Sequence, residues 1–214
     1  DEEELEFIKS IIKILDISRA DKYDNWIRLG WCLHNIDYSL LKDWIEFSKK
    51  SYKFVDGECE KEWNMMDNEG LGVGTLYLWA KEDNAYKYKE IVRRNLRKCM
   101  LESLSLEPND IARVVYNLYK NEFVCYSAKK NAWYQFKNHR WIEIDDAIDL
   151  RKRLSSEVIH EYDMLDSHLS DQITQLTDED EKDIKRRKKE TIHKIIKQLK
   201  RTSFKKSVVQ ECNE

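Results

Sequence analysis

The sequence WIRLGWCLH at residues 26–34 opens a tryptophan-rich stretch that decides the fold of the first part of the chain. The stretch continues as WIEFSKKSYKF at 44–54, CEKEWNMM at 59–66 and GVGTLYLWA at 72–80. Five of the seven tryptophans of the chain lie in it. Because each block has helical spacing between charged flanks, we expect a small helical module with large rings in its core. Stacking of these rings on nucleic-acid bases is the alternative use.

Particular residues of this stretch have expected structural roles. Gly30 lies inside a predicted helix, where glycine costs about 1 kcal/mol relative to alanine, so we expect a helix or a tryptophan ring to approach it closely. Asp56 and Thr75 are the expected N-caps of the next two helices. The residues assigned to structural cores along the chain are Trp26, Gly30, Trp44, Trp63, Thr75, Trp133 and Trp141.

The composition favours a helix-rich globular protein. Charged residues make up 37% of the 214 residues and hydrophobic residues 41%, with one proline and five glycines. The five cysteines are widely spaced and include no CxxC pair, so we expect reduced thiols and neither a disulfide framework nor a zinc knuckle. No apolar run approaches the roughly 18 to 20 residues that span a bilayer, so we expect no membrane association.

The second part of the chain changes its period. Pro108 precedes a strong helix-start signal. Three short segments follow, with the sequences FVCYS at 123–127, AWYQF at 132–136 and HRWIEI at 139–144. These short aromatic and β-branched runs predict a three-stranded antiparallel meander. Apolar residues every three or four positions over 150–176 predict one long helix, and Thr177 with Asp180 resembles a capping box before a last, basic helix.

These patterns give a mainly α protein (α+β) with three segments. Residues 1–88 are the expected helical module, 89–108 the connecting helix or linker, and 109–214 a domain with the meander and long helices.

No motif in the chain predicts catalysis. GLGVGT at 70–75 lacks both the preceding apolar strand of a dinucleotide site and the GK[ST] of a phosphate-binding loop, so it predicts a turn into a helix. His160, Asp163 and His168 are the one grouping that suggests a metal-dependent hydrolase, but their spacing fits a solvated helix face better. We therefore expect no catalytic residue and no metal site.

Three basic tracts are the candidate nucleic-acid contacts, because cations gain affinity by releasing counterions from phosphates. A solvated helix face is the alternative interpretation. The residues in these tracts are Lys49, Lys50 and Lys53; Arg93, Arg94, Arg97 and Lys98; and Arg186, Arg187, Lys188 and Lys189.

The tryptophan stretch resembles the second type of primase C-terminal domain, which follows the primase domain in many viral and plasmid replication proteins. That pattern has four ordered blocks: W-x-x-x-G-x-x-L, W-x-x-x-S-x-K-S, C-x-x-x-W and G-T-L. The matching residues are Trp26, Gly30 and Leu33; Trp44, Ser48, Lys50 and Ser51; Cys59 and Trp63; and Gly74, Thr75 and Leu76.

The sequence over about 109–162 resembles the domain that precedes the superfamily 3 helicase in poxvirus-type primase–helicases of large DNA viruses. It reads NDIARVVYNLYKNEFVCYS, then WYQFKNHRWIEID, then LRKRLSSEV. The resemblance implies a middle segment between a primase and a hexameric ATP-driven helicase, acting with both domains and with single-stranded or template–primer DNA at a viral replication site in the host cytoplasm. ATP and Mg²⁺ would then belong to the downstream helicase, and this segment would hold no cofactor. A free-standing nucleic-acid-binding regulator is the alternative.

Overall fold

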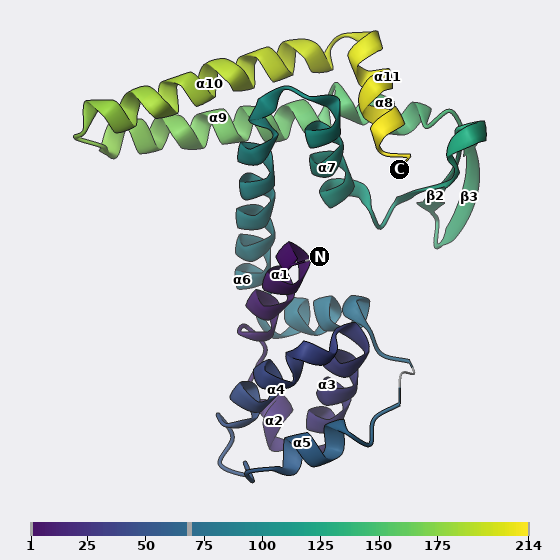
Figure 1. Ribbon diagram of the computed structural model, residues 1–214, viewed down its shortest axis with the longest axis vertical. Coiled ribbons are helices and arrows are strands. Elements are labelled where there is room, and N and C mark those ends of the chain that lie inside the picture. Colours follow the sequence, from purple (N-terminus) through teal and green to yellow (C-terminus); the bar gives the residue numbers. More distant parts are fainter. Residues whose placement is uncertain (1, 68–69, 214) are drawn as a thin grey trace. The chain divides into compact units, whose positions relative to one another are not determined.

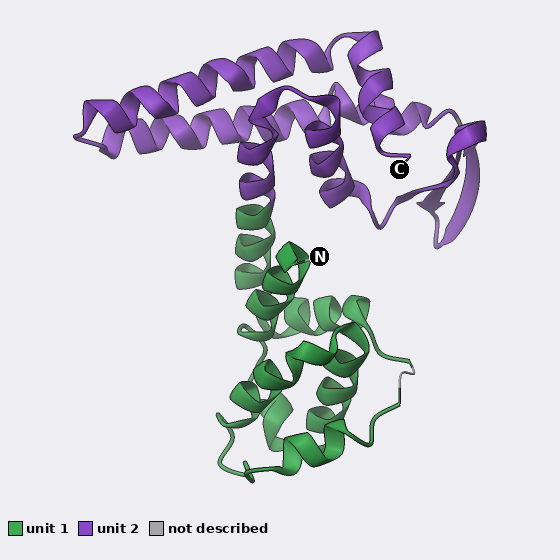
Figure 2. Cartoon of the chain, viewed as in Figure 1, with its two compact units in different colours: residues 1–95 green, residues 96–214 purple. Residues whose placement is uncertain are grey.

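The structure is a computed structural model that describes residues 2–67 and 70–213. The chain forms two compact units, residues 1–95 and 96–214 (Figure 2), and the division falls inside the expected connecting segment 89–108. The prediction of a mainly α protein with a three-stranded antiparallel sheet and long helices is confirmed.

The first unit is built from helices (Figure 1). Its elements, with α6 continuing past the boundary, are α1 (Glu2–Ile12), α2 (Ser18–Asp21), α3 (Tyr23–Ile36), the 3-10 turn η1 (Tyr38–Leu40), α4 (Leu41–Ser48), α5 (Glu58–Trp63) and α6 (Val73–Glu102). The helical backbone of α6 is interrupted at Asn84, whose φ of −154° and ψ of 76° kink the helix. The helix expected from Thr75 and the connecting helix expected after it therefore meet at this kink, as two helical segments of α6.

Three tryptophans form the centre of the first unit. The rings of Trp26 and Trp44 are stacked with centroids 4.7 Å apart, and the ring centroid of Trp63 lies 5.6 Å from that of Trp44. Trp44 and Trp63 have no exposed surface, and Trp26 is 7% exposed. The indole N–H of Trp26 donates to Ser48 Oγ at 2.8 Å, which gives this buried polar group its partner. These rings are core residues, unavailable for stacking on bases.

Gly30 permits the closest approach in this core. A Cβ at this position would lie 2.4 Å from Cζ2 of Trp44 and 2.8 Å from Cε of Met66. Real carbon atoms do not approach that closely, so the ring of Trp44 occupies the space that any side chain would need. The expectation that a tryptophan ring approaches Gly30 is therefore confirmed.

Two expected helix caps in the first unit are wrong. The residue before α5 is Gly57, whose φ of 82° lies in the left-handed region, and the carboxylate of Asp56 does not cap the helix. Thr75 lies in the first turn of α6, and its N–H donates to the carbonyl of Gly72 at 2.9 Å. Thr75 is only partly buried. At both helix starts, a backbone turn stands where a side-chain cap was predicted.

The second unit combines a small sheet with helices. The elements that follow α6 are η2 (Ser103–Ser105), α7 (Pro108–Tyr119), β1 (Phe123–Ser127), η3 (Ala128–Lys130), β2 (Ala132–Lys137), β3 (Arg140–Asp145), α8 (Ile148–Leu154), α9 (Glu157–Gln175), α10 (Glu179–Leu199) and α11 (Thr202–Glu211). Pro108 occupies the first turn of α7, where its missing N–H costs nothing.

The core of the second unit lies where α7, α9 and α10 meet the end of α6. Helices α9 and α10 run side by side as a hairpin (Figure 1). The buried residues of this hairpin include Leu165 and Leu169 on α9 and Ile192 and Ile195 on α10. The hydroxyls of Ser103 and Tyr162 lie 2.6 Å apart inside this core, so the polar end of the buried tyrosine has a partner.

Helix α11 completes this core from the far end of the sequence. It packs against α7 and α8, and its Val208 and Val209 are buried in the same cluster as Ile111 of α7. The thiol of Cys212 points to the carbonyl of Ala112, 4.0 Å away. The last basic helix of the prediction corresponds to α10, and α11, which follows it and was not predicted, closes the unit.

The meander has the order β1-β2-β3 with antiparallel pairing. Val124 pairs with Tyr134, Tyr134 with Glu143, and Phe136 with Trp141. Phe123 and Trp133 face the core and are buried. Trp141 is 46% exposed, so its assignment to the core is wrong: it lies on the opposite face of the sheet.

The helix expected over 150–176 is broken after Leu154. Ser156 has φ −125° and ψ −78°, outside the helical region, and the hydroxyl of Ser155 donates to the carbonyl of Leu199 at 3.1 Å. The hydroxyl of Ser156 donates to the carbonyl of Lys152 at 3.1 Å, so the break is stabilised by one local side-chain hydrogen bond and by the one from Ser155 to a residue distant in sequence. At the next break, the carboxylate of Asp178 accepts from the N–H groups of Asp180 and Glu181, so Asp178 is the cap and not Thr177.

Candidate nucleic-acid interface

The tract on α6 presents exposed cations. Arg93, Arg94 and Lys98 are exposed and Arg97 is partly buried. Lys98 lies 3.9 Å from Glu102, whereas no carboxylate in residues 2–67 and 70–213 is within ion-pair distance of Arg93 or Arg94. These two guanidinium groups are therefore available to phosphates, because they need not break an existing pair.

The tract on α10 divides into engaged and available side chains. Lys189 donates to Ser170 Oγ at 2.6 Å and lies 3.5 Å from Asp166, so it joins the two helices of the hairpin. Arg186 pairs with Asp183 at 2.6 Å and with Glu179 at 3.5 Å. Arg187 and Lys188 have no ion-pair partner among the described residues. Of the four cations predicted here, these two are the best placed for an external anion.

The tract in the first unit is tied to its own module. Lys49 and Lys50 are exposed and lie 5.9 Å and 5.3 Å from the rings of Phe54 and Phe47, within cation–π range. The amine of Lys53 donates to the carbonyl of Asp21 at 2.7 Å. Lys53 therefore stabilises the loop after α4, which leaves Lys49 and Lys50 as the more accessible members.

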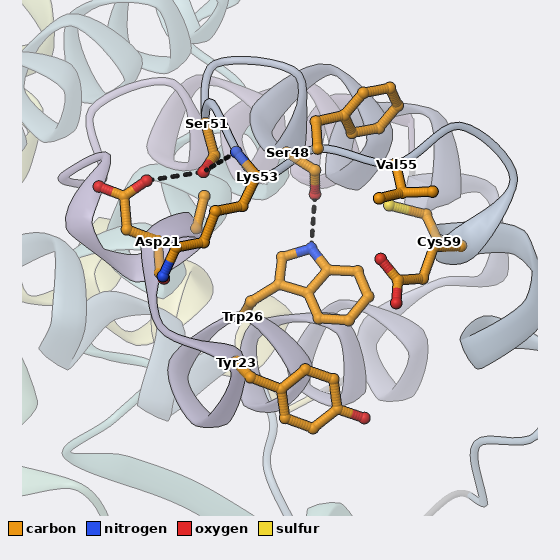
Figure 3. Close-up of a pocket in the computed structure, with 11 residues that line it drawn as sticks. Asp21, Tyr23, Trp26, Ser48, Ser51, Lys53, Val55 and Cys59 are labelled. Carbon is orange, nitrogen blue, oxygen red and sulfur yellow. Dashed lines mark hydrogen bonds between the residues drawn. The ribbon is translucent and has the colours of Figure 1, made fainter.

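A pocket of about 130 Å³ lies beside this tract (Figure 3). Ser51 donates to the carboxylate of Asp21 at 2.6 Å, and the N–H of Lys53 donates to Ser51 Oγ at 3.2 Å. The polar groups at the rim of the pocket are therefore hydrogen-bonded to one another. The ring of Trp26 and the side chain of Cys59 also line it (Figure 3). Pockets for small molecules are usually about 300 to 1,000 Å³. This pocket therefore carries no argument for a small-molecule ligand.

The groups considered for metal or nucleophilic chemistry do not form a site. His160 and Asp163 are exposed on α9, and His168 is hydrogen-bonded to Gln172 at 3.0 Å. Within residues 2–67 and 70–213, no cluster of three or more histidine, cysteine or acidic side chains has metal-binding geometry. Burial, together with the charges of Arg97 and Lys185, lowers the pKa of His168, which favours its neutral form.

The cysteines are free thiols, and burial lowers the reactivity of two of them. Burial raises the pKa of Cys32 to about 12 and that of Cys212 to about 12. A thiol with so high a pKa is protonated at neutral pH and is a poor nucleophile. The expectation of unpaired cysteines is confirmed for the described part of the chain.

The sequence did not single out the outer face of the meander as a surface. Its aromatic side chains Tyr126, Phe136 and Trp141 are 47%, 40% and 46% exposed. The signal that could have found them is the alternation of strand residues, which places every second side chain on the same face. In β2, however, Trp133 and Phe136 lie on opposite faces, so aromatic character alone did not distinguish inside from outside.

Comparison with known proteins finds a family match within the first unit. Residues 8–80 match the family described as Primase C terminal 2 (PriCT-2). This range contains the three packed tryptophans and Gly30, so the residues that make the core are also those of the family match. Among the described helices, none is both long and apolar enough to cross a membrane.

Relatives that match most of the chain come from large DNA viruses. A protein of Acanthamoeba polyphaga mimivirus is 37% identical over 99% of this chain and 22% of its own length. A protein of Frog virus 3 is 26% identical over 98% of the chain and 25% of its own length. A third, from Invertebrate iridescent virus 3, is 28% identical over 67% of the chain and 17% of its own length. All three bear the name "Putative helicase".

The chain thus spans a quarter or less of the length of each of these relatives. The resemblance to the primase C-terminal module is confirmed, and so is the similarity to proteins of large DNA viruses that are named as putative helicases.

Proposed function

We propose, from the primase C-terminal 2 module at residues 8–80 and the similarity to viral helicases, that this chain is a non-catalytic segment of a DNA-replication primase–helicase. In that role it couples a primase domain to an ATP-driven helicase, aids assembly of a hexamer and contacts DNA. The observation that supports the coupling role most directly is that the chain folds as two units, of which the first carries the primase-associated module.

The proposed DNA contact depends on the available cations of the two helical tracts. Arg93 and Arg94 on α6 and Arg187 and Lys188 on α10 are not engaged by carboxylates within the described residues. Each cation that neutralises a phosphate releases a counterion, which makes the affinity fall with salt. Lys189 and Lys53 are expected to matter less, because both already bind groups of their own unit.

ATP and Mg²⁺ are proposed for the helicase part of the whole protein and for a site elsewhere in it. The glycine string at 70–75 has Thr75 but no lysine before it, and so lacks the group that a phosphate-binding loop directs to the β- and γ-phosphates. We place the work of the whole protein at a viral replication site in the host cytoplasm.

Binding of labelled single-stranded and double-stranded DNA across a salt series tests the DNA contact. Replacing Arg187 and Lys188 with glutamate should weaken binding, and the slope of log K against log salt should fall by about one for each phosphate that is no longer neutralised. The control is the same charge change at Lys13 and Lys22, two exposed cations outside the tracts. No DNA binding at low salt, or equal weakening in the control, would refute the contact.

Sedimentation of the chain joined to a helicase domain tests the assembly role. A strict monomer in that fusion would contradict it. The sequence of the full reading frame distinguishes the proposed role from the alternative, a free-standing nucleic-acid-binding regulator. The proposed role requires a phosphate-binding loop in the same polypeptide.

A further inference from the structure

The two faces of the meander have different surroundings. On the inner face, Phe123, Trp133 and Gln135 are buried against the rest of the second unit. On the outer face, no such cover lies over the aromatic side chains among the described residues, and Phe136 and Trp141 remain 40% and 46% exposed. An antiparallel sheet with one solvated face normally carries polar residues there, so exposed aromatic rings need an explanation.

The outer rings are arranged as two neighbouring pairs. Tyr126 and Tyr134 have centroids 4.6 Å apart with ring planes at 34°, and Phe136 and Trp141 have centroids 5.3 Å apart at 60°. Tyr134 and Phe136 are two residues apart on β2, a separation of about 7 Å along a strand. The hydroxyl of Tyr126 donates to the carboxylate of Glu143, which fixes that ring. The face therefore presents two ordered aromatic platforms side by side.

Both ends of the sheet carry cations. The exposed basic side chains at the two strand connections and their flanks are Lys129, Lys130, Lys137 and Arg140. None of them has an ion-pair partner among the described residues. Nearby acids are engaged, because Asp146 pairs with Arg151 at 2.6 Å and Glu143 accepts from Tyr126. An anionic ligand that crosses the sheet would thus meet free positive charge at each end.

We propose that the outer face of the meander binds single-stranded nucleic acid, with bases on the two aromatic platforms and phosphates near the basic ends. Every base has a π-face that stacks on an aromatic ring, and cationic grooves follow the phosphate backbone. A duplex conceals these π-faces, so the site selects single strands. The inference rests on the proposed nucleic-acid role of the chain but concerns a surface separate from the tracts on α6 and α10.

The test measures binding of labelled oligothymidylate, oligouridylate and a DNA duplex to the 214-residue protein and its variants. Trp141→Ala and Tyr134→Ala should weaken single-strand binding about 5- to 150-fold, the loss expected for one stacked base, while duplex binding stays unchanged. Trp141→Phe retains a ring and should lose much less. Trp31→Ala is the matched control, because Trp31 is a 43% exposed tryptophan of the first unit. The two oligonucleotides distinguish DNA from RNA.

A direct reading does not depend on variant stability. Photo-crosslinking of an oligonucleotide that carries 5-iodouracil, followed by peptide mapping, should place the crosslink on β2 or β3 of the wild-type protein. Crosslinks confined to α6 or α10 would overturn the proposal and leave the tract contacts intact.

Other outcomes separate this inference from the proposed function. If Trp141→Ala and Tyr134→Ala are folded by circular dichroism and bind single strands normally, the inference fails, whether or not the Arg187 and Lys188 substitutions weaken binding. If those charge changes have no effect and the aromatic variants do, the inference stands and the tract contact fails. A change only in self-association of Trp141→Ala would identify the face as a protein interface and overturn the proposal.

Discussion

The tryptophans of the first unit and the aromatic residues of the meander are similar in kind and opposite in placement. Trp44 has no exposed surface and is packed against two other indoles, whereas Trp141 is 46% exposed on the outer face of a sheet. The difference shows that the elements surrounding a ring, more than its hydrophobicity, decide its role. Helices surround Trp44, while the sheet has helical cover on one face.

The two units also differ in how they order their rings. In the first unit, indole rings stack on one another, and the missing side chain of Gly30 leaves room for the ring of Trp44. The second uses polar groups: Arg153 lies 5.1 Å from the ring of Tyr119 and 5.2 Å from that of Phe123, and its guanidinium is held by Glu122. Substitutions in each region test this contrast.

The largest loss is expected for Trp44→Ala. Removing a fully buried ring that touches two others leaves a cavity, and such substitutions cost about 3 to 5 kcal/mol. Urea unfolding followed by circular dichroism and tryptophan fluorescence measures the free energy. Trp31→Ala is the control on the same module. Equal, small losses for both variants would show that the indole stack is not the core of the first unit.

Gly30→Ala is expected to have the next largest effect. The added Cβ would lie 2.4 Å from Trp44, and overpacking of this kind costs about 1 to 3 kcal/mol even though alanine is the better helix former. Gly74→Ala is a matched control, because the same atom at Gly74 meets nothing within 4 Å. A thermal melt in which Gly30→Ala is as stable as Gly74→Ala would mean that the module relaxes around its ring.

Arg153→Met tests the polar mode of the second unit. Arg153 donates to both oxygens of Glu122, at 2.7 and 2.5 Å, and both side chains are partly exposed, so we expect a loss of about 1 kcal/mol at neutral pH. Lys152→Met is the control, since Lys152 is the exposed neighbour. Lys152→Met should be nearly neutral when both variants are unfolded in urea.

The same pair predicts a pH dependence. Burial alone would raise the pKa of Glu122, but hydrogen bonds from Arg153 and Gln135 outweigh it and hold the pKa below its usual range. A lowered folded pKa gives stability that is present above the unfolded value and is lost as pH falls through the folded value. The difference in the free energy of unfolding between wild type and Arg153→Met should therefore become smaller in acid. A difference that stays constant with pH would show that the contact of Arg153 with the rings of Tyr119 and Phe123, and not its pair with Glu122, stabilises the protein.

The smallest effect on stability is expected for Trp141→Ala. Substitutions of exposed side chains usually change the free energy of unfolding by less than about 0.5 kcal/mol, with some further loss here from the contact with Phe136. Differential scanning calorimetry measures the change. A loss as large as that of Trp44→Ala would show that the outer face is structural, and the contrast between the two regions would then disappear.

The periodicity of apolar residues predicts most helices and strands but not the contacts, distant in sequence, that decide where they end. The i, i+3, i+4 pattern located the helices, and β-branched and aromatic runs located the three strands. The break at Ser155 and Ser156 was missed because the apolar spacing continues across it, from Leu154 to Val158. That break depends on Ser155 reaching Leu199, a residue distant in sequence.

The sheet shows why the candidate site was only partly predictable. In β2, Trp133 and Gln135 share the buried face, while Tyr134 and Phe136 share the outer one. A buried glutamine and an exposed phenylalanine reverse the usual pattern, because Gln135 donates to Glu122 at 3.2 Å and so satisfies its amide inside. Sequence identified the basic tracts as charge clusters, but only the structure separates Lys189, which is engaged, from Arg187.

The packing of α11 on α7 has a consequence for the order in which the chain can mature during synthesis. All the buried hydrophobic side chains of the first unit's core precede residue 92, so this core is complete early in translation. The second unit lacks part of its core until Val208 and Val209 leave the ribosome, although Ile111 was made about a hundred residues before. The surface of α7 that α11 covers therefore stays exposed until the last helix of the unit has been made, so the second unit completes its core later than the first.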